Sequence, residues 1–445
     1  MPATDFAHSQ RYLAEFLEPL MPILGRQERR VGATRYLQGL LLPGARKSIE
    51  PMAQRLGIDA QGLQQFVADS PWEEELLWRE IRRQVLPTLG VLEAWIVDET
   101  GWLKQGRDSV GVSHQYCGAV GKQANCQVCV EIAVSDGEIA APAAGRLYLP
   151  ERWCEEAARR SKAGVPEEIP FRTKPQIALE LLTRMTEDGV ARAPVLGDAA
   201  YGDSSEFRAG LRRLGLAYFL QVSPGGHVAW EQPPQLIKKQ KRRHPAPGQS
   251  APRPLLAIAA DIAADQWQRV QWKAADESTR QTRLAWQRVF LAHGLRHAGG
   301  EIEETWLVVD WPENDPAPYH CYLAEFSSPP QAASCLRLSR SRWHIEQYFQ
   351  RGKSDLGLDH YEGRGWRGFH HHLVLSALAY LFVLALHQRE KKNFWPDVGS
   401  GPASDPAILA EVDRLLSLLR DKIHPGKLRI RHNRVILEPV MHFSG

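Results

Sequence analysis

The spacing of apolar residues predicts a helical first segment. Residues 1 to about 90 place apolar side chains at helical intervals and carry few strand signals. Within this segment, Ser48 is predicted to begin a short helix and Asp59 a second one, with a turn at Gly57 between them. That spacing is typical of a DNA-binding helix-turn-helix, although an ordinary helical hairpin has the same pattern.

From residue 91 the pattern changes to that of an α/β layer. Its first run, Val91–Val97, is apolar without alternation, which predicts a strand buried on both faces. The expected order is strands near 91–97, 111–120 and 126–134, a helix over 174–187, a strand over 193–197, a helix over 204–214 and a strand over 217–222. This order predicts a mixed sheet with flanking helices.

Residues 223–330 interrupt that rhythm with alternating segments, which predict a mostly β insertion. Helical periodicity returns near residue 331 and includes the apolar run Leu373–Leu386. At about 14 residues this run is shorter than the roughly 20 that span a bilayer, so we expect a buried core helix. The predicted parts are a helical DNA-binding domain (1–90), a catalytic domain (91–222 and 331–390), the insertion (223–330) and a basic, helical tail (391–445).

Composition adds little to this division but narrows the class of protein. The chain has 43% hydrophobic and 24% charged residues, as soluble globular proteins do, and its net charge is only +3. Contact with a polyanion would therefore depend on local basic segments, of which 26–30, 238–243 and 422–434 are the clearest. The first residues do not resemble an export signal, and the six cysteines are scattered. We expect a cytoplasmic protein with no membrane partner.

Two aspartates follow predicted strands and are candidates for chemistry. Asp98 follows the first apolar strand, and Asp198 follows the strand over 193–197. A strand that ends in Asp holds a carboxylate at the rim of an α/β sheet, where sites tend to form. Each aspartate alone could equally begin a turn or cap a helix, but neighbouring strands would bring the two together.

Glu346 is the third candidate carboxylate. Arg342, Glu346 and Lys353 are spaced to share one face of a helix, a spacing that a surface stripe of ion pairs shares. Close carboxylates repel one another unless a cation neutralises them, and Mg²⁺ prefers hard oxygen ligands. Two such ions, roughly 4 Å apart, stabilise both the attacking and the leaving oxygen of a phosphoryl displacement. Arg342 and Lys353 would then contact the phosphate backbone.

Several longer stretches carry a family resemblance. The segments VDETGWLKQG, VLGDAAYGD and WHIEQYFQRGKSDLGLDHYEGRGW, together with others between residues 91 and 388, resemble bacterial insertion-sequence transposases. These have a DDE catalytic domain of the ribonuclease-H-like fold. The chain is most similar to the group numbered seven-oh-one, related to hairpin-forming cut-and-paste transposases.

The resemblance implies an activity and roles for residues. It implies a transposase that cleaves transposon ends and joins them to target DNA, with Asp98, Asp198 and Glu346 binding two Mg²⁺ ions, for which Mn²⁺ could substitute. It also implies double-stranded DNA as substrate, a hairpin intermediate and a homodimer in the synaptic complex. Arg342 and Lys353 match the basic positions of the family's signature, whereas Ser339 stands where relatives have tyrosine.

In relatives a tryptophan of the insertion stacks on a flipped base. Trp286 is the expected counterpart here, with Trp267 and Trp272 nearby as alternatives. The insertion also carries a basic run, either a solvated loop or a phosphate contact, formed by Lys238, Lys239, Lys241, Arg242 and Arg243.

The remaining polar clusters favour structural roles. Cys126 and Cys129 have no second pair at zinc spacing, and His370–His372 open the apolar helix. Asp203 and Glu99 lie beside the proposed ligands and could support them. Two other functions stay open: a ribonuclease-H-like nuclease that cuts without joining, and a domesticated DNA-binding protein without catalysis.

Overall fold

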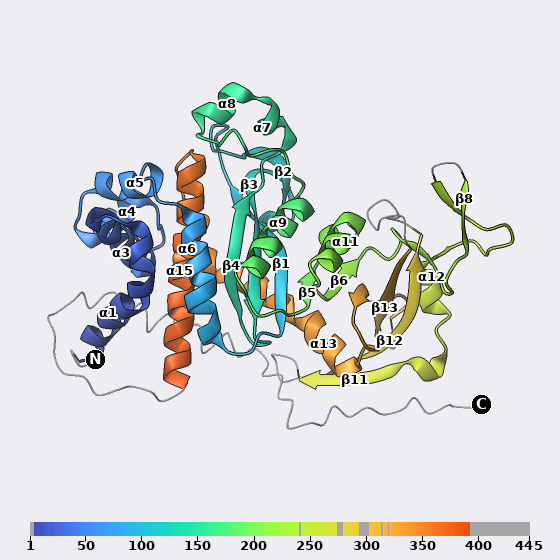
Figure 1. Cartoon of the computed structure of the whole chain (residues 1–445). Helices are drawn as coiled ribbons and strands as arrows, with labels where there is room; N and C mark the ends of the chain where they lie inside the picture. The colour runs from blue at the N-terminus through green and yellow to red at the C-terminus, as the bar shows by residue number, and fades with distance from the viewer. Residues whose placement is uncertain are drawn as a thin grey trace. The chain divides into compact units, whose positions relative to one another are not determined.

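The computed structural model describes residues 4–239, 242–273, 279–292, 302–312, 315–318 and 320–391. They form two compact units (Figure 1). Among the described residues, the first unit comprises residues 4–92, 98–191 and 343–391, and the second comprises those within 93–97 and 192–342. The predicted tail helix over 406–419 and its basic end lie outside the described residues.

The first unit begins with the predicted helices. They are α1 (Thr4–Leu17), α2 (Met21–Leu24), α3 (Gln27–Leu41), α4 (Ile49–Leu56), α5 (Ala60–Ala68) and α6 (Glu74–Glu80), with short helical turns η1 (Glu18–Leu20), η2 (Ile81–Val85) and η3 (Leu86–Leu89). Ser48 and Asp59 are the N-cap residues of α4 and α5 as expected, although neither side chain makes a capping hydrogen bond. Gly57 ends α4 with φ +63°, a left-handed conformation that favours glycine.

The sheet of the first unit is built on β1 (Ala94–Leu103), β2 (Ser113–Cys117), β3 (Lys122–Ser135) and β4 (Ala140–Leu147), with the turn η4 (Gly118–Val120) between β2 and β3. β3 is antiparallel to both β2 and β4, and β1 is its neighbour in the strand order. β2 and β3 confirm the expected meander. The expectation that the first strand ends at Asp98 is wrong, because β1 continues to Leu103 and buries Trp102 beyond the carboxylate.

Five helices complete the first unit: α7 (Glu151–Glu155), α8 (Ala157–Lys162), α9 (Lys174–Glu187), α14 (Trp343–Leu356) and α15 (Trp366–Lys391). α9 has the predicted bounds. Thr173 begins it with a capping box, in which its side chain and that of Gln176 each accept the other's backbone N–H.

α15 is the core helix of the first unit, as predicted from its apolar run. It is longer than that run, and Trp366–Gln388 has the length and composition to cross a membrane, but 94% of its most apolar window is buried inside the protein. α15 lies between the N-terminal helices and β4 (Figure 1). Phe369 on α15 stacks on Trp102 of β1, with ring centroids 4.3 Å apart.

The second unit contains the strands that follow β1 in the strand order. Its strands are β5 (Val195–Gly197), β6 (Tyr218–Val222), β7 (Val228–Trp230), β10 (Arg253–Pro254), β11 (Gln268–Lys273), β12 (Thr279–Leu291), β13 (Glu303–Trp311) and β14 (His320–Glu325), with a separate hairpin of β8 (Leu236–Lys239) and β9 (Arg242–Pro245). Its helices are α10 (Ala199–Gly202), α11 (Ser205–Arg213), α12 (Leu255–Ala260) and α13 (Ala332–Ser341), with the turn η5 (Ala264–Gln266). The strand order is β1-β5-β6-β14-β13-β12-β7-β10, with β11 beside β12.

β1 belongs to both units and fixes the fold class. Its residues Trp95 and Ile96 pair in parallel with β5, which is parallel to β6, while β6 pairs antiparallel with β14. The predicted mixed sheet with flanking helices, a helical beginning and a mostly β insertion is confirmed. The insertion also contains α12, which its alternating pattern did not predict.

Candidate active site

Asp98 lies in β1 immediately after four fully buried residues. The buried stretch Ala94–Val97 gives way to the half-buried pair Asp98 and Glu99. The backbone N–H of Glu99 donates to Asp98 Oδ1 at 2.8 Å. The Glu99 carboxylate instead forms an ion pair with Lys174 at the start of α9. Glu99 is therefore neutralised by a lysine, and β1 presents the Asp98 carboxylate at the edge of the core.

Glu346 is an exposed residue of α14, and its neighbours hold that helix against β3. His344 Nδ1 lies 3.3 Å from the Ser135 hydroxyl, and the Tyr348 hydroxyl donates to the carboxylate of Glu131 at 2.9 Å. Ser135 and Glu131 both belong to β3 and are four positions apart along the chain. Glu346 lies between His344 and Tyr348 in α14, so the contacts of these two residues with β3 fix its position on the unit.

Lys353 gives α14 a third attachment. Its Nζ donates to the carbonyl of Gly101 in β1 at 2.8 Å, and burial lowers the pKa of its ammonium. The expected helix face is only partly confirmed: Glu346 and Lys353 share α14, but Arg342 lies in the turn between α13 and α14. This single residue separates α13, which ends at Ser341, from α14, which begins at Trp343. Ser339, at the family's tyrosine position, uses its hydroxyl to bond the Leu336 carbonyl within α13.

Glu131 is a site feature that sequence reasoning missed. Its side chain is fully buried in β3, and burial raises its pKa to about 8, although the Tyr348 hydroxyl and the charge of Lys353 oppose that shift. Its other oxygen, Oε1, has no hydrogen-bond partner among the described residues. The one signal in the sequence is an acidic residue inside the otherwise apolar run VCVEIAV. Burial therefore favours the protonated form of Glu131 beneath α14.

Asp198 lies in the second unit, directly after β5. It is the N-cap of α10, and its Oδ1 accepts the backbone N–H of Ala200 at 3.0 Å. The helix-capping alternative raised by the sequence is therefore realised. Capping leaves the carboxylate half-buried at the end of a buried strand, because one oxygen is enough to accept the backbone bond.

Asp203 supports the segment that follows Asp198. Its Oδ1 accepts the backbone N–H of Ser223 at 2.9 Å and lies 2.8 Å from His227 Nε2. Although partial burial raises the pKa of Asp203, these bonds outweigh it and lower that pKa. Asp203 thus joins the end of α10 to the chain that leaves β6.

A buried ion pair holds α11 on the insertion. Arg208 donates to Glu303 through Nε at 2.7 Å and through Nη2 at 2.9 Å, with both side chains almost fully buried. Arg208 also bonds the Gly202 carbonyl at the end of α10. The insertion strand β13 therefore supports the helix that Asp198 caps.

The three tryptophans of the sequence prediction have different surroundings. Trp267 is only 7% exposed, donates to the Ile262 carbonyl and lies under Arg283. The guanidinium of Arg340 covers the ring of Trp272 at 4.1 Å. Trp286, on β12, is half-buried and has no hydrogen bond or ring contact within the described residues. Of the three, Trp286 has the π-face least engaged by the protein.

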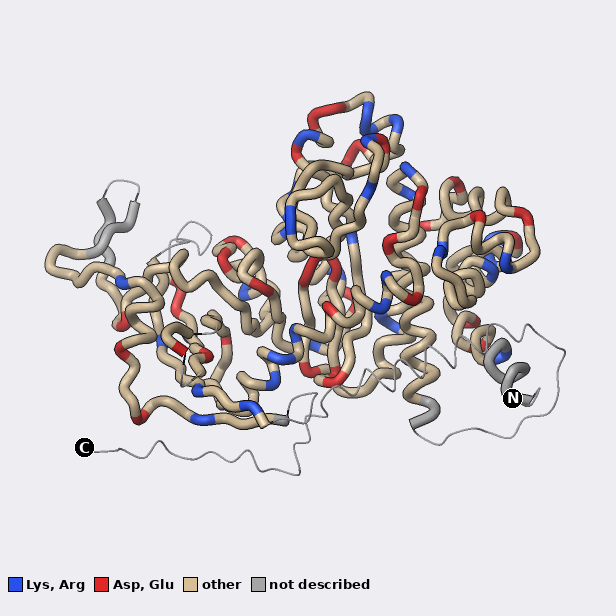
Figure 2. Tube along the Cα trace, turned by 180° about the vertical axis from the view of Figure 1, so that it is seen from behind, with Lys and Arg blue, Asp and Glu red and all other residues tan. Residues whose placement is uncertain are grey.

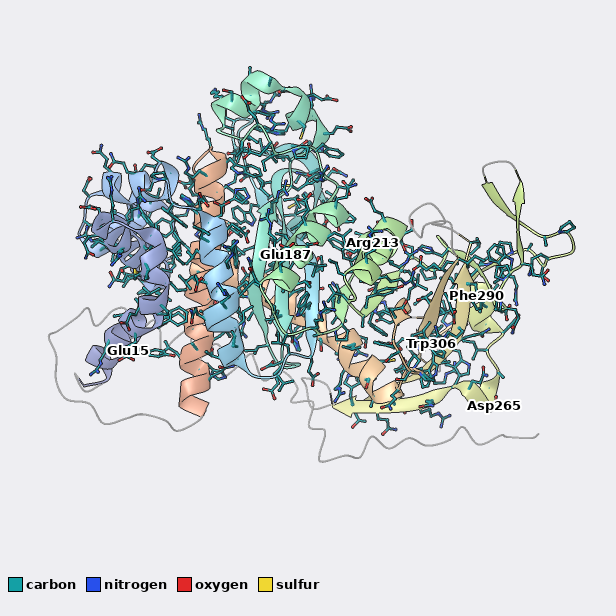
Figure 3. All side chains as sticks on the ribbon, viewed as in Figure 1. Glu15, Glu187, Arg213, Asp265, Phe290 and Trp306 are labelled. Atoms are coloured by element: carbon teal, nitrogen blue, oxygen red, sulfur yellow. The ribbon has the colours of Figure 1, made fainter. Side chains whose placement is uncertain are left out.

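A neighbouring tryptophan of the same sheet, Trp306, has its ring covered by an arginine. Trp306 on β13 lies under Arg288 of β12, 4.3 Å from its ring centroid, and Figure 3 shows its place with that of Phe290. This contact follows from the strand register, which sets Arg288 opposite Trp306. It distinguishes Trp306 from Trp286, whose partner in the register is Val308.

The basic run of the insertion forms a hairpin. β8 and β9 pair antiparallel, with Lys238 opposite Arg243 and Lys239 opposite Arg242, while Lys241 lies outside the described residues. In the coloured part of the trace, basic and acidic residues are interspersed among other residues (Figure 2). The hairpin is therefore a local concentration of positive charge in a chain of mixed charge.

The cysteine and histidine clusters are structural. Burial raises the pKa of Cys126 to about 12 and that of Cys129 well above its ordinary value. Burial lowers the pKa of His370 and of His371 to about 4 and that of His372 to about 3. The two ring nitrogens of His371 lie 2.9 Å from the Val67 carbonyl and 2.8 Å from the Trp72 carbonyl, and the other two imidazoles also have hydrogen-bond partners inside the core. No three His, Cys, Asp or Glu residues in the described part of the chain stand close enough to hold a metal ion.

Comparison with known proteins agrees with the sequence prediction. The profile of the family described as DDE superfamily endonuclease matches residues 19–281. A protein of Microchaete diplosiphon named as the probable transposase for insertion sequence element IS701 is 32% identical over 203 residues, which are 44% of this chain and 50% of that protein. The chain thus spans about half the length of this curated relative.

Among solved structures, a piggyBac transposase synaptic complex with hairpin DNA is similar over 89% of this chain and 73% of that chain, with a TM-score of 0.43 and 10% identity. Of these similarities, the family match covers well over half of the sequence and includes both Asp98 and Asp198. The chain belongs to the DDE superfamily endonuclease family.

Proposed function

We propose that the chain is a DNA transposase that cuts transposon ends and joins them to target DNA by metal-dependent phosphoryl transfer. The observation that supports this most directly is the register of β1 and β5. Trp95 pairs with Val195 and Ile96 with Leu196, in parallel. Asp98 in β1 and Asp198 directly after β5 each come two residues after the last paired position, which supports their use in one site.

Asp98, Asp198 and Glu346 are the proposed ligands of two Mg²⁺ ions. The donor set fits: all three are carboxylates, hard oxygen ligands, and each lies on an element held by buried contacts. When bound, the ions would activate the attacking oxygen and stabilise the leaving one. Because carboxylates repel one another without a cation, ligation is proposed to draw the three together. Mn²⁺, with similar ligand preferences, would substitute.

The DNA contacts are proposed on both units. Lys353 and Arg342 would bind phosphates near the scissile bond, and the basic hairpin, in which Lys238 and Lys239 face Arg243 and Arg242, would bind backbone further away. Trp286 is proposed to stack on a base flipped out during hairpin formation.

The remaining expectations extend this proposal. The helices of residues 1–90 would bind DNA, and a homodimer would hold the two transposon ends in one synaptic complex. In a bacterial cell the protein would work on the nucleoid. The named relative is itself a probable transposase, which supports the reaction class for the half of that relative covered here.

The test measures cutting and binding on the same variants. Asp98→Ala, Asp198→Ala and Glu346→Ala should each abolish cleavage of the element's own end DNA in Mg²⁺, while gel-shift affinity stays near that of wild type. Asp265→Ala, which removes an exposed aspartate of the second unit, is the matched control and should cut normally (Figure 3). Cleavage retained by one of the three alanine variants removes that residue from the site.

Joining distinguishes the alternatives. A supercoiled target plasmid should acquire the cut ends, and end-labelled products should include a hairpin. Cutting without joining would make the chain a ribonuclease-H-like nuclease. Binding without either reaction in Mg²⁺ or Mn²⁺ would make it a domesticated DNA-binding protein.

A further inference from the structure

The exposed face of α5 is entirely polar or glycine. The helix buries Leu63, Phe66 and Val67 on one side, and Phe66 stacks on Trp72 with centroids 5.6 Å apart. The opposite side exposes Gln61, Gly62, Gln64 and Gln65. These positions follow from the helical period, because the residues at 61, 64 and 65 lie opposite the buried stripe. Three glutamine amides therefore project from one face of a short, well-anchored helix.

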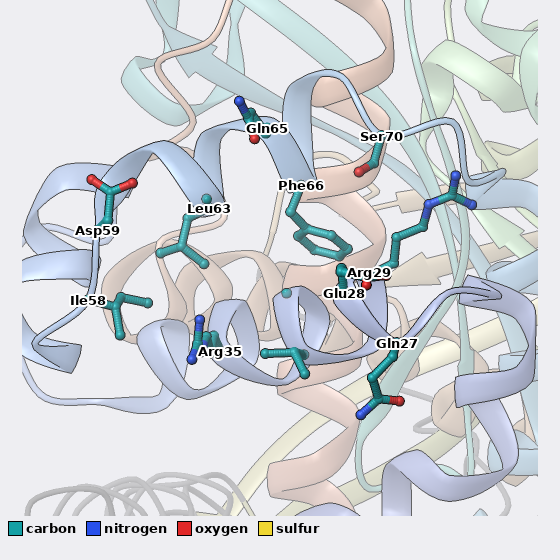
Figure 4. Close-up of a pocket in the computed structure, with 13 residues that line it drawn as sticks. Gln27, Glu28, Arg29, Arg35, Ile58, Asp59, Leu63, Gln65, Phe66 and Ser70 are labelled. Carbon is teal, nitrogen blue, oxygen red and sulfur yellow. The ribbon is translucent and has the colours of Figure 1, made fainter.

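Hollows flank this glutamine face on both sides. Between α3 and α5 lies a pocket of about 420 Å³, whose lining includes Arg29, Arg35, Gly62 and Gln65 (Figure 4). On the other side, Gln61 and Gln64 border a hollow of about 410 Å³ that reaches the start of α4. α5 is thus a ridge between two recesses, the shape of an element that enters a groove.

Gly62 has no side chain, so α5 exposes its backbone at that position. A Cβ built at Gly62 would meet nothing within 4 Å, so no packing requirement explains a glycine there. Gly57 supplies the left-handed turn that separates α4 from α5 by three residues. Backbone exposed at Gly62 allows close approach of a ligand surface, and the tight turn is that of a helix-turn-helix.

The segment around α5 carries a surplus of positive charge. Between Arg26 and Asp69 there are seven Lys and Arg against four Asp and Glu, a surplus of three that equals the net charge of the whole protein. Arg29 and Arg35, which line the first hollow, make no ion pair among the described residues. Two guanidinium groups beside the ridge are therefore available for phosphates.

We propose that α5 enters the major groove of duplex DNA and reads adenine with Gln61, Gln64 and Gln65, while Arg29 and Arg35 bind the adjoining phosphates. The glutamine amide donates to adenine N7 and accepts from its N6 amino group, a two-bond match that no other base offers in that groove. The inference rests on the proposed function, because it assigns to that DNA-cutting protein the element that recognises its sequence. A protein partner fits less well, since interface cores are apolar and this ridge is not.

The test uses the full-length protein and a library of randomised 20-base-pair duplexes, with selected sequences read after several rounds of binding. Wild type should select a site that contains clustered adenines. Gln61→Ala, Gln64→Ala and Gln65→Ala should each lose the preference at one position, with discrimination against the substituted base falling about 5- to 150-fold. Gln84→Ala, at another exposed glutamine of the first unit, should select the wild-type site.

The arginines give a separate readout. Arg29→Gln and Arg35→Gln should weaken binding to all duplexes and reduce the slope of log affinity against log salt by about 1 each. Glutamine variants that select the wild-type site, or a wild-type site without adenine, would overturn the inference even if the protein cuts and joins DNA. Selection of an adenine site by a protein that never cuts would support the inference and defeat the proposed function instead.

Discussion

Replacing Glu131 by glutamine should make the protein more stable at neutral pH. The carboxyl is fully buried, and burial raises its pKa from an ordinary value of 4.5 to about 8. Glutamine has the same shape, and its carbonyl accepts the hydrogen bond from Tyr348 as the acid does. Glu131→Gln therefore removes the proton equilibrium while keeping the contact with α14.

The sign follows from proton linkage. Above pH 4.5 the unfolded chain releases the Glu131 proton, whereas the folded protein keeps it until about pH 8. Folding then takes up a proton, so the free energy of unfolding of the wild type falls as pH rises through that window. At 1.36 kcal/mol per pH unit, the loss between pH 4.5 and pH 7 is about 3 kcal/mol. The Glu131→Gln variant has no such loss.

Urea denaturation followed by tryptophan fluorescence at pH 5, 6, 7 and 8, without divalent cations, measures this difference. The stability gap between Glu131→Gln and wild type should widen steadily from pH 5 to pH 8. Glu138→Gln, at an exposed residue of the loop after β3, is the matched control and should track the wild type. A gap that stays constant with pH would refute the assignment of Glu131 as a buried, protonated acid.

Other predictions concern the ion pair, the tryptophans and the helix that carries Glu346. Glu303→Ala should cost about 3–5 kcal/mol of stability, because it leaves Arg208 buried without its carboxylate, and the double change with Arg208→Met should cost less than the single one in a denaturation series. Trp286→Ala should leave the first nick intact but slow hairpin formation roughly 10- to 100-fold in a product time course, whereas Trp267→Ala should mainly lower stability, by about 3–5 kcal/mol, in a melting curve. Lys353→Gln, which keeps an N–H donor for the Gly101 carbonyl, should reduce the salt slope of DNA binding by about 1; an unchanged slope with full activity would exclude a phosphate contact there.

The sequence predicted best where a local signal and tertiary packing agree. α9 has its expected bounds because Thr173 and Gln176 form a capping box at its start. The β4 strand was missed because AAPAAGRL consists largely of alanine, glycine and proline, which have low strand propensity, and only burial between neighbours makes it a strand. β1 was ended too early, because its two acidic residues interrupt an apolar run that the backbone continues through.

The candidate site was predictable only in part, because some of its features depend on tertiary packing and have no local signal. Asp98, Asp198 and Glu346 are recognisable from motifs that stay short and contiguous in the chain. Glu131 is not, because the role of a buried acid depends on a helix more than 200 residues later that supplies the Tyr348 hydroxyl. The interruption of the helix at Arg342 likewise has no glycine or proline to announce it.

The place of α15 has a consequence for how the protein is made. This helix, Trp366–Lys391, receives the N-terminal helices on one side and β4 on the other, and its His371 and His372 bond to Val67, Trp72 and Tyr36. A ribosome therefore synthesises the α3–α5 segment some 300 residues before the helix against which it packs. Nascent chains and truncated products that end before α15 lack the support for that segment as well as Glu346 or its surroundings. The order of synthesis thus delays the packing of both the α3–α5 segment and α14, because α3, α5 and α14 all contact α15.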